Sequence, residues 1–380
     1  MRKSALGIIV AGLAASLVVS ACSSSKKSTG GTSGATAGGG GATSSAAGGG
    51  GKVGVILPDQ TSSPRYIAYD QPLLAKAFAD AGIDANIQNA QGDKTKFASI
   101  ADSMLQTGIQ VLIVDALDSP SGAAVEQKAK AAGVKTIDYD RLNLGGSADY
   151  YVSFDNVAVG KLQGQGLVDC LTKAGTKNPA VAELNGSPDD NNATLFAQGY
   201  NSVLDPKYSS GEYKKAGNQA VPMWDKDKAV TIFQGMYTAT GGKIDGVLAA
   251  NDTLGNAAIT ILKQNGRKIP VTGQDATVQG LQNILSGDQC MTVFKDVKKE
   301  ADAAAKLAIG LIKGQSAESL GATAKSHDPT GNRDVPSVLL TPVTITKANI
   351  KTVTDTGEVK VADVCKGYEA QCKAAGLSTT

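Results

Sequence analysis

Short apolar runs alternate with longer amphipathic stretches along most of the chain. The apolar run at residues 111–114 is rich in β-branched side chains, which is typical of a strand buried on both faces. Strands that alternate with helices predict a parallel sheet with right-handed crossovers. In this first series we expect strands at 53–57, 85–88, 111–114, 134–139 and 150–154, and helices at 66–81, 94–106 and 122–132.

The same alternation resumes after residue 156. Two such series predict an α/β fold of two similar doubly wound parallel-sheet lobes, whose strand ends face one cleft. The part of the chain from residue 52 onward also exceeds the usual size of a single domain. The second series has expected strands at 180–184, 213–216, 246–250, 271–273 and 291–294, and helices at 157–171, 193–204, 225–240, 253–265, 277–285 and 297–313.

Polar residues follow several of the expected strands, at the ends where open parallel sheets bind ligands. Each cluster alone is consistent with a helix N-cap or a turn, because Asn and Asp favour both. Together they supply amides, carboxylates, Arg and Lys, which is hydrogen-bonding chemistry for hydroxyl groups. The clusters lie at 58–60, 65–66, 185–192, 251–252, 274–275 and 295–296.

Asp140 and Arg141 are the most informative of these polar residues. They follow the strand expected at 134–139, so they should lie at the carboxyl edge of the first sheet. An adjacent carboxylate and guanidinium offer acceptors and a forked donor together, as a polyhydroxylated ligand requires. The alternative is a surface ion pair, which usually contributes little to stability.

The N-terminus reads as an export signal rather than as part of the fold. Arg2 and Lys3 precede an apolar run that ends in small residues before Cys22, and residues 1–21 are expected to be a lipoprotein signal peptide. The junction resembles a bacterial lipoprotein cleavage box, which implies lipidation of Cys22. An ordinary secretory signal is the alternative. Residues 22–51 are mostly Ser, Gly, Thr and Ala, which predicts a flexible tether that does not fold.

The charge balance argues against nucleic acid as a partner. The chain has 37 basic and 35 acidic residues, and the basic residues form no block. Loss of Arg2 and Lys3 with the signal peptide would leave the two charges equal. A neutral body without a basic patch lacks the electrostatic footprint of nucleic-acid binding.

Four cysteines remain after Cys22, in a compartment that permits disulfides. Four cysteines allow three pairings, and the sequence does not choose among them. The short spacing makes Cys365 with Cys372 the first candidate, which leaves Cys170 with Cys290. No metal site is expected, because no CxxC pair occurs and His327 is the only histidine.

Seven sequence motifs lie along residues 52 to about 352. They are Tyr139-Asp140-Arg141, Tyr151-Val152-Ser153-Phe154-Asp155-Asn156, Gly186-Ser187-Pro188 with Asp190-Asn191-Asn192-Ala193, Ala250-Asn251-Asp252, Gly273-Gln274-Asp275, Met291-Thr292-Val293-Phe294-Lys295 and Asp334-Val335-Pro336-Ser337. Together they resemble the D-xylose-binding family of periplasmic proteins, which serve ABC sugar importers. The resemblance implies two lobes joined by a three-strand hinge, the first from 52–156 and 294–336 and the second from 157–293 and 337–380.

The resemblance implies a monosaccharide site in the interlobe cleft. Two aromatic rings would cover the apolar faces of the sugar, and polar side chains would bond its rim. Tyr66 departs from the family, which usually has a tryptophan there, and this departure puts strict pentose selectivity in question. From position alone, Trp224 is equally consistent with a core aromatic and Tyr66 with a surface ring. The implied ligand-binding residues are Arg65, Tyr66, Asp140, Arg141, Asn192, Trp224, Asn251, Asp275 and Lys295.

The expected function is therefore that of a monomeric substrate-binding lipoprotein, anchored by lipid to the outer face of the cell membrane. It would bind D-xylose without a cofactor, close on it and deliver it to ABC permease subunits. Another aldose (arabinose, glucose, galactose or ribose) and a chemosensory role are alternatives. An enzyme acting on sugars is less favoured, because the carboxylates alternate with Arg, Lys and Asn and no histidine lies near them. The export signal argues against a transcription regulator of the same fold.

Overall fold

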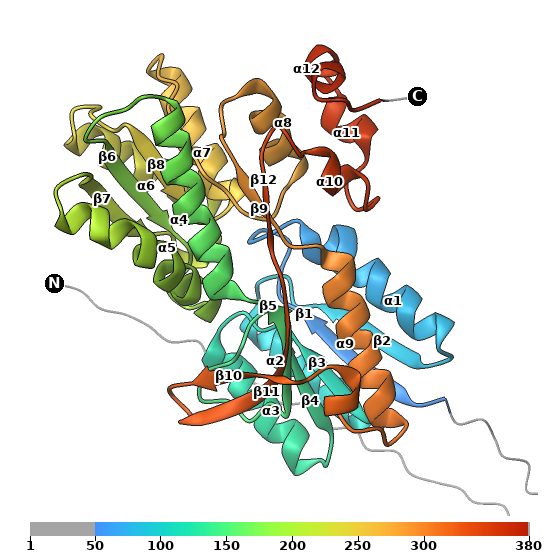
Figure 1. The fold of residues 1–380 in the computed structure, drawn as a ribbon. Coiled ribbons are helices and arrows are strands. Elements are labelled where there is room, and N and C mark those ends of the chain that lie inside the picture. The colour runs from blue at the N-terminus through green and yellow to red at the C-terminus, as the bar shows by residue number, and fades with distance from the viewer. Residues whose placement is uncertain (1–49, 379–380) are drawn as a thin grey trace, which may run out of the picture. The chain divides into compact units, whose positions relative to one another are not determined.

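The computed structural model describes residues 50–378, and Figure 1 labels its elements. The expected signal peptide, Cys22 and nearly all of the expected tether lie outside the described residues. Two lobes are present, each built around its own sheet, and the α/β fold expected from the sequence is confirmed. The chain moves from the first lobe to the second after β5 and returns to the first at α9.

The first lobe contains a seven-stranded sheet in the order β10-β11-β5-β4-β3-β1-β2. β1 to β5 are parallel, as the βαβ pattern predicts, and β11 joins them as a sixth parallel strand beside β5. β10 pairs antiparallel with β11 at one edge. The strands are β1 (Lys52–Leu57), β2 (Asp84–Asn89), β3 (Val111–Val114), β4 (Lys135–Tyr139), β5 (Tyr150–Phe154), β10 (Ala324–Asp328) and β11 (Arg333–Leu340).

Helices cover both faces of this sheet. Val55 and Leu57 of β1 pack with α1 and α9, while Ile56 between them packs with α2 and α3 on the other face. Successive side chains of a strand point to opposite faces, so a continuous apolar run matches a strand covered on both sides. The helical elements are η1 (Tyr66–Asp70), α1 (Gln71–Asp80), α2 (Lys94–Gln106), α3 (Ser119–Ala131), α9 (Val297–Ile312) and η3 (Glu318–Leu320).

The second lobe has a three-stranded parallel sheet in the order β7-β6-β8. The strand expected at 271–273 is reduced to a single bridge between Val271 and Val247. The largest apolar core lies in this lobe and includes Phe196 and Trp224. The elements are α4 (Asn156–Lys173), β6 (Ala180–Asn185), α5 (Asn191–Ser209), β7 (Lys214–Ala220), η2 (Pro222–Trp224), α6 (Lys226–Ala239), β8 (Gly246–Ala249) and α7 (Asp252–Gln264).

A smaller core joins α8 to the C-terminal segment and includes Leu281, Phe294 and Val364. Within this core, Tyr69 of η1 packs against residues that come from far along the sequence. The elements are α8 (Val278–Ser286), β9 (Thr292–Phe294), β12 (Val343–Ile345), α10 (Lys351–Thr354), α11 (Val361–Cys365) and α12 (Glu369–Ala374).

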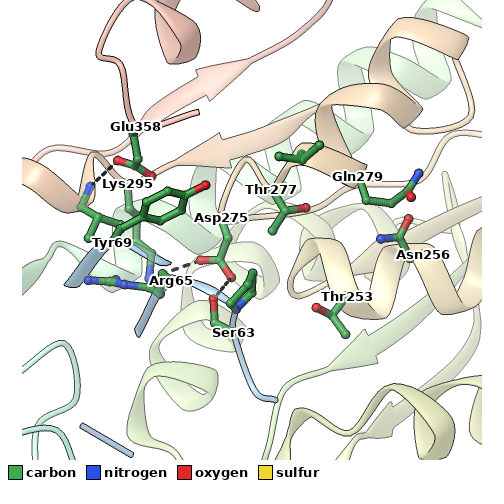
Figure 2. A pocket seen from close by; sticks show the side chains of 13 residues that line it. Ser63, Arg65, Tyr69, Thr253, Asn256, Asp275, Thr277, Gln279, Lys295 and Glu358 are labelled. Carbon is green, nitrogen blue, oxygen red and sulfur yellow. Dashed lines mark hydrogen bonds and ion pairs between the residues drawn. The ribbon is translucent and has the colours of Figure 1, made fainter. Parts of the chain in front are cut away.

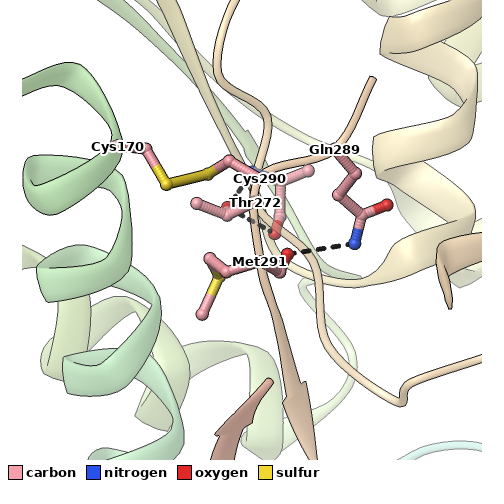
Figure 3. Close-up of a disulfide and its surroundings, with 6 residues drawn as sticks. Cys170, Thr272, Gln289, Cys290 and Met291 are labelled. Atoms are coloured by element: carbon pink, nitrogen blue, oxygen red, sulfur yellow. Dashed lines mark hydrogen bonds between the residues drawn. A yellow bond between two sulfur atoms is a disulfide. The ribbon is translucent and has the colours of Figure 1, made fainter. Parts of the chain in front are cut away.

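Two disulfides are present, and they are the pairs that the sequence favoured. Cys170 is bonded to Cys290, which ties α4 to the segment before β9 (Figure 3). Cys365 is bonded to Cys372, which ties α11 to α12.

Three strands were not expected from the sequence: β10, β11 and β12. The first two form a hairpin whose residues are largely polar, and β11 contains Pro336. β11 also pairs with β5 as far as Leu340, beyond the lobe boundary proposed at residue 336. The exact lobe boundaries therefore stay a prediction.

Helices α4 and α5 contact each other closely at Gly160 and Gly199, and a substitution there tests how much this contact stabilises the fold. A Cβ atom at Gly160 would lie 2.0 Å from the carbonyl oxygen of Phe196, a backbone atom that cannot turn aside. We expect Gly160→Ala to lower the free energy of unfolding by about 2 kcal/mol or more, measured by chemical denaturation.

Gly235→Ala in α6 is the matched control, because a Cβ atom there would meet nothing within 4 Å. Its stability should rise by roughly 0.5–1 kcal/mol, since alanine is the better helix former. Equal effects of the two substitutions would contradict the close α4–α5 crossing.

Candidate functional site

All nine residues expected to bind a ligand line one small cavity of about 30 Å³. Arg65 and Tyr66 follow β1, Asp140 and Arg141 follow β4, and Lys295 follows β9. The remaining four come from the second lobe: Asn192 in α5, Trp224 in η2, Asn251 before α7 and Asp275 before α8. The cavity is thus built from strand ends and helix starts of both lobes, and we call it the inner cavity.

Asp140 is the centre of the site through its backbone. It adopts a left-handed conformation with φ of 58°, which aspartate tolerates better than most residues. Its carbonyl oxygen accepts hydrogen bonds from Ser153 Oγ at 2.8 Å and Tyr151 Oη at 3.0 Å. It also accepts one from Asn192 Nδ2 at 3.0 Å. Asn192 belongs to the second lobe, so this bond joins the two lobes directly.

The Asp140 carboxylate lies among cations. Its Oδ1 is 3.3 Å from Arg65 Nη1 and 3.5 Å from Lys295 Nζ, and its Oδ2 accepts a 2.8 Å hydrogen bond from Tyr66 Oη. Burial alone would raise the pKa of Asp140, but the charges of Lys295, Arg65 and Arg141 outweigh burial and hold that pKa well below its usual range. The carboxylate is therefore ionised at neutral pH and acts as an acceptor.

Most of the Arg65 guanidinium bonds to carboxylates outside the cavity lining. Nε and Nη2 donate to the two carboxylate oxygens of Asp70, at 2.9 and 2.7 Å. Nη2 also donates to Glu300 Oε2 at 2.6 Å. Asp70 and Glu300 are fully buried, so Arg65 neutralises carboxylates from η1 and α9. Only Nη1 bonds to Asp140. Arg65 therefore both lines the cavity and connects Asp140 to the buried carboxylates of the first lobe.

Arg141 links the two lobes at the other end of the cavity. Its Nη2 donates to Ser62 Oγ and to Tyr66 Oη, each at 3.1 Å. Its Nε lies 3.2 Å from Asp190 Oδ2, a carboxylate at the start of α5 in the second lobe. The Tyr66 hydroxyl therefore sits between Arg141 and Asp140 as a bridge.

Two cations contact the Tyr66 ring, which is buried. The guanidinium carbons of Arg65 and Arg141 are 5.7 and 5.6 Å from the ring centroid. Burial raises the pKa of Tyr66 well above its usual value, so the hydroxyl stays protonated and donates a hydrogen bond to Asp140. The surface ring suggested as an alternative is wrong, because Tyr66 is only 2% exposed.

Trp224 both belongs to the core and lines the cavity. Its Nε1 donates to Asp190 Oδ2 at 3.1 Å, and its ring meets Phe196 edge to face with centroids 6.4 Å apart. A Cβ atom on Gly186 would lie 2.0 Å from the indole, so this glycine makes the space that the ring occupies. The indole edge and Phe196 form the apolar part of the wall.

Lys295 and Asp275 meet on the side of the cavity opposite Arg141. Lys295 Nζ is 3.8 Å from Asp275 Oδ1, and Ser63 Oγ donates to Asp275 Oδ2 at 3.3 Å. Burial would lower the pKa of Lys295, but Asp140 and Asp275 raise it, so the amine stays charged. Burial raises the pKa of Asp275 despite Lys295. Asn251 caps α7, its Oδ1 accepting from the Leu254 amide at 3.0 Å.

Five further residues line the inner cavity that the sequence analysis did not assign to the ligand site. Asp190 belongs to the polar cluster at 185–192. Its bonds to Arg141 and Trp224 depend on tertiary packing, which cannot be read from the sequence. Phe196 lies four residues after Asn192 in α5, so helical spacing alone places it on the same face. The five are Ser62, Ser63, Asp190, Phe196 and Gln274.

Two larger cavities flank the inner cavity. One of about 290 Å³ shares Ser63, Arg65, Asp275 and Lys295 with it and is drawn in Figure 2. The other, of about 130 Å³, lies on the Arg141 side and is bordered by the ion pair of Lys94 and Asp118. The inner cavity is far smaller than the roughly 300 Å³ at which ordinary small-molecule sites begin, so its walls must move apart to admit such a ligand.

Residues 50–378 include no cluster of His, Cys, Asp or Glu suited to hold a metal ion. Within that same range, every helix is too short or too polar to cross a membrane. Hydrogen-bonding side chains and three aromatic rings, those of Tyr66, Phe196 and Trp224, line the inner cavity.

A two-lobed α/β protein with a polar cavity between its lobes has the architecture of a solute-binding receptor. A family model described as periplasmic binding protein domain matches residues 53–316, and the chain belongs to this family. The chain is 36% identical over 284 residues to the D-xylose-binding periplasmic protein of Escherichia coli (strain K12), covering 74% of this chain and 83% of that protein.

Other relatives take different sugars. The multiple sugar-binding periplasmic receptor of Rhizobium radiobacter is 36% identical over 330 residues, covering 83% of this chain and 92% of the receptor. A carbohydrate transporter solute-binding protein of Chloroflexus aurantiacus, solved with D-glucose, is 31% identical with a TM-score of 0.74 and covers 82% of this chain and 97% of its own. Two of these relatives are named as sugar-binding periplasmic proteins, and the third as a solute-binding protein of a carbohydrate transporter.

The hydroxyl of Tyr66 gives a test of how the site is held together. Tyr66→Phe would leave Asp140 and Arg141 buried with one partner fewer each. We expect the free energy of unfolding to fall by about 1–3 kcal/mol, measured by denaturant titration.

Tyr237→Phe is the control, since the Tyr237 hydroxyl makes no hydrogen bond to any other described residue. Its effect should stay within roughly 0.5 kcal/mol. A loss at Tyr66 no larger than that at Tyr237 would show that the bridging hydroxyl does not stabilise the cluster.

Proposed function

We propose that this chain is the extracytoplasmic substrate-binding lipoprotein of an ABC sugar importer, with D-xylose as its ligand. The sugar binds in the inner cavity, between Asp140 and Arg141 of the first lobe and Asn192 and Trp224 of the second. The observation that carries this proposal is the lining itself, in which acids, bases, amides and three aromatic rings from both lobes surround one space.

Each part of the lining suits one part of a monosaccharide. Sugar hydroxyls donate and accept hydrogen bonds, so the ionised Asp140 serves as acceptor while Arg141 and Lys295 serve as donors. The edge of Trp224 and the ring of Phe196 supply an apolar surface for the C–H face of the sugar ring. A site that bonds hydroxyls also rejects analogues that lack them, because its own buried groups would stay unpaired.

Binding is coupled to closure of the lobes. The Asn192 bond to the Asp140 carbonyl and the Arg141 pair with Asp190 both cross between the lobes. A ligand that contacts both lobes stabilises the closed form by its greater affinity for that form. The permease then recognises the closed form, while lipid on Cys22 and the tether at 22–51 keep the receptor at the outer face of the membrane.

A second aldose is the alternative ligand. The relatives include a receptor named for multiple sugars and a protein solved with D-glucose, beside those named for D-xylose. Tyr66 favours a broader choice than a tryptophan would, because its hydroxyl bridges the Asp140–Arg141 pair and adds a polar group to that wall.

Calorimetric titration of the purified protein tests the ligand. D-xylose, L-arabinose, D-glucose, D-galactose and D-ribose form the panel, and we expect saturable binding with D-xylose the tightest. Trp224, the only tryptophan of the chain, should change its fluorescence in the same titration. Failure of all five sugars to bind would refute the monosaccharide assignment.

Asp140→Ala and Arg141→Ala test the residues. Each should weaken sugar binding by roughly 100-fold or more, because removal of one member leaves other buried charges unpaired. Asp80→Ala is the control for the carboxylate, since Asp80 forms an exposed pair with Lys76 and should leave affinity unchanged. Circular dichroism of each variant shows whether it is folded. Unchanged affinity in a folded Asp140 or Arg141 variant would contradict the assigned role.

A further inference from the structure

The 290 Å³ cavity beside the inner cavity is not explained by a monosaccharide ligand, and we call it the lateral chamber. It is nearly ten times larger than the inner cavity and comes close to the lower bound of about 300 Å³ for small-molecule sites. Figure 2 shows Asp275 near its middle, with Tyr69 and Glu358 on one side and Thr253, Asn256, Thr277 and Gln279 on the other.

The lateral chamber and the inner cavity share a boundary of four residues. Ser63, Arg65, Asp275 and Lys295 line both spaces. This boundary is made of side chains, of which Ser63 and Asp275 are joined by a single 3.3 Å hydrogen bond. A ligand in the inner cavity therefore has one end directed at this polar boundary, with open space behind it.

The wall of the lateral chamber that α7 and α8 form carries free hydrogen-bonding groups. Asn256 Oδ1 accepts from Asn283, which leaves the Asn256 amide nitrogen without a bond among residues 50–378. Gln279 Nε2 donates to Asn283 Oδ1 at 3.2 Å, which leaves the Gln279 oxygen similarly available in the described chain. The wall thus presents a donor and an acceptor to whatever occupies the chamber.

The opposite wall, formed by η1 and the C-terminal segment, supplies the aromatic ring of Tyr69 and the carboxyl group of Glu358. Tyr69 is partly buried and packs on the C-terminal core, which holds its ring in place. Glu358 Oε2 accepts from the Val297 amide at 2.9 Å. Burial raises the pKa of Glu358 to about 8, so the carboxyl carries a proton at neutral pH and adds a donor. The C-terminal segment that positions Glu358 is itself tied by the disulfide of Cys365 and Cys372.

We propose that the lateral chamber is a subsite for a second sugar ring, linked to the sugar in the inner cavity. The inference rests on the proposed function and extends the substrate class to disaccharides. An aromatic ring with separate donors and acceptors around it is the lining that a pyranose requires. The cavity on the Arg141 side is less than half as large, and its cations Lys94 and Arg141 already pair with Asp118 and Asp190, so the ligand extends toward Tyr69 instead.

Calorimetry with matched pairs of sugars tests the subsite on the whole mature protein. The pairs are D-xylose with β-1,4-xylobiose and D-glucose with cellobiose. For whichever monosaccharide binds, its disaccharide should bind at least as tightly. A disaccharide that binds more than 100-fold more weakly than its monosaccharide would overturn the inference and leave the proposed function standing. Failure of both members of both pairs would contradict the proposed function and the subsite together.

Gln279→Trp tests the location, because residue 279 is exposed at the chamber wall and the larger ring fills that space. We expect at least a tenfold loss of disaccharide affinity, with monosaccharide affinity changed less than about threefold. Gln234→Trp, at an exposed position of α6, is the matched control and should change neither. Equal losses for both sugars, or no loss for the disaccharide, would show that the chamber is not a sugar subsite. Tyr69→Ala should reproduce the selective loss.

Discussion

The buried carboxylate of Asp140 is the constraint on which the rest of the site depends. An ionised carboxylate taken out of water is costly unless cations and hydrogen bonds replace the water. Here Arg65, Lys295 and the Tyr66 hydroxyl supply that replacement. Arg65 in turn requires Asp70 and Glu300, which come from η1 and α9. One connected set of ion pairs therefore links the site to the interior of the first lobe. Removing any one of these charged side chains leaves another charge buried and unpaired.

The same residue couples the charge cluster to the meeting of the lobes. The left-handed backbone of Asp140 turns its carbonyl toward Asn192 while its carboxylate stays with the cations. Non-glycine residues in this conformation are uncommon and concentrate at functional sites. Asp190 completes the link from the other side, because its carboxylate meets Arg141 of the first lobe and the indole of Trp224 in its own lobe.

The regular parts of the fold were predictable from hydrophobic pattern alone. The elements expected at 94–106, 111–114 and 150–154 appear with those bounds as α2, β3 and β5, because local periodicity and buried strands determine them. Strands β10 to β12 were missed. β10 is mostly polar, while β11 and β12 pair with β5 and β9, which lie far from them in the sequence. The site residues were named from strand ends and from family motifs. Their partners Asp70, Glu300 and Asp190 were not assigned to the site, because only tertiary packing brings those carboxylates to Arg65 and Arg141.

A crystal structure of the protein with D-xylose tests the central claim most directly. The account predicts the sugar in the inner cavity, with one hydroxyl within about 3 Å of the Asp140 carboxylate and its C–H face against Trp224 or Phe196. It also predicts hydrogen bonds to the sugar from both lobes. A sugar bound outside this cavity, or held by one lobe only, would contradict the account.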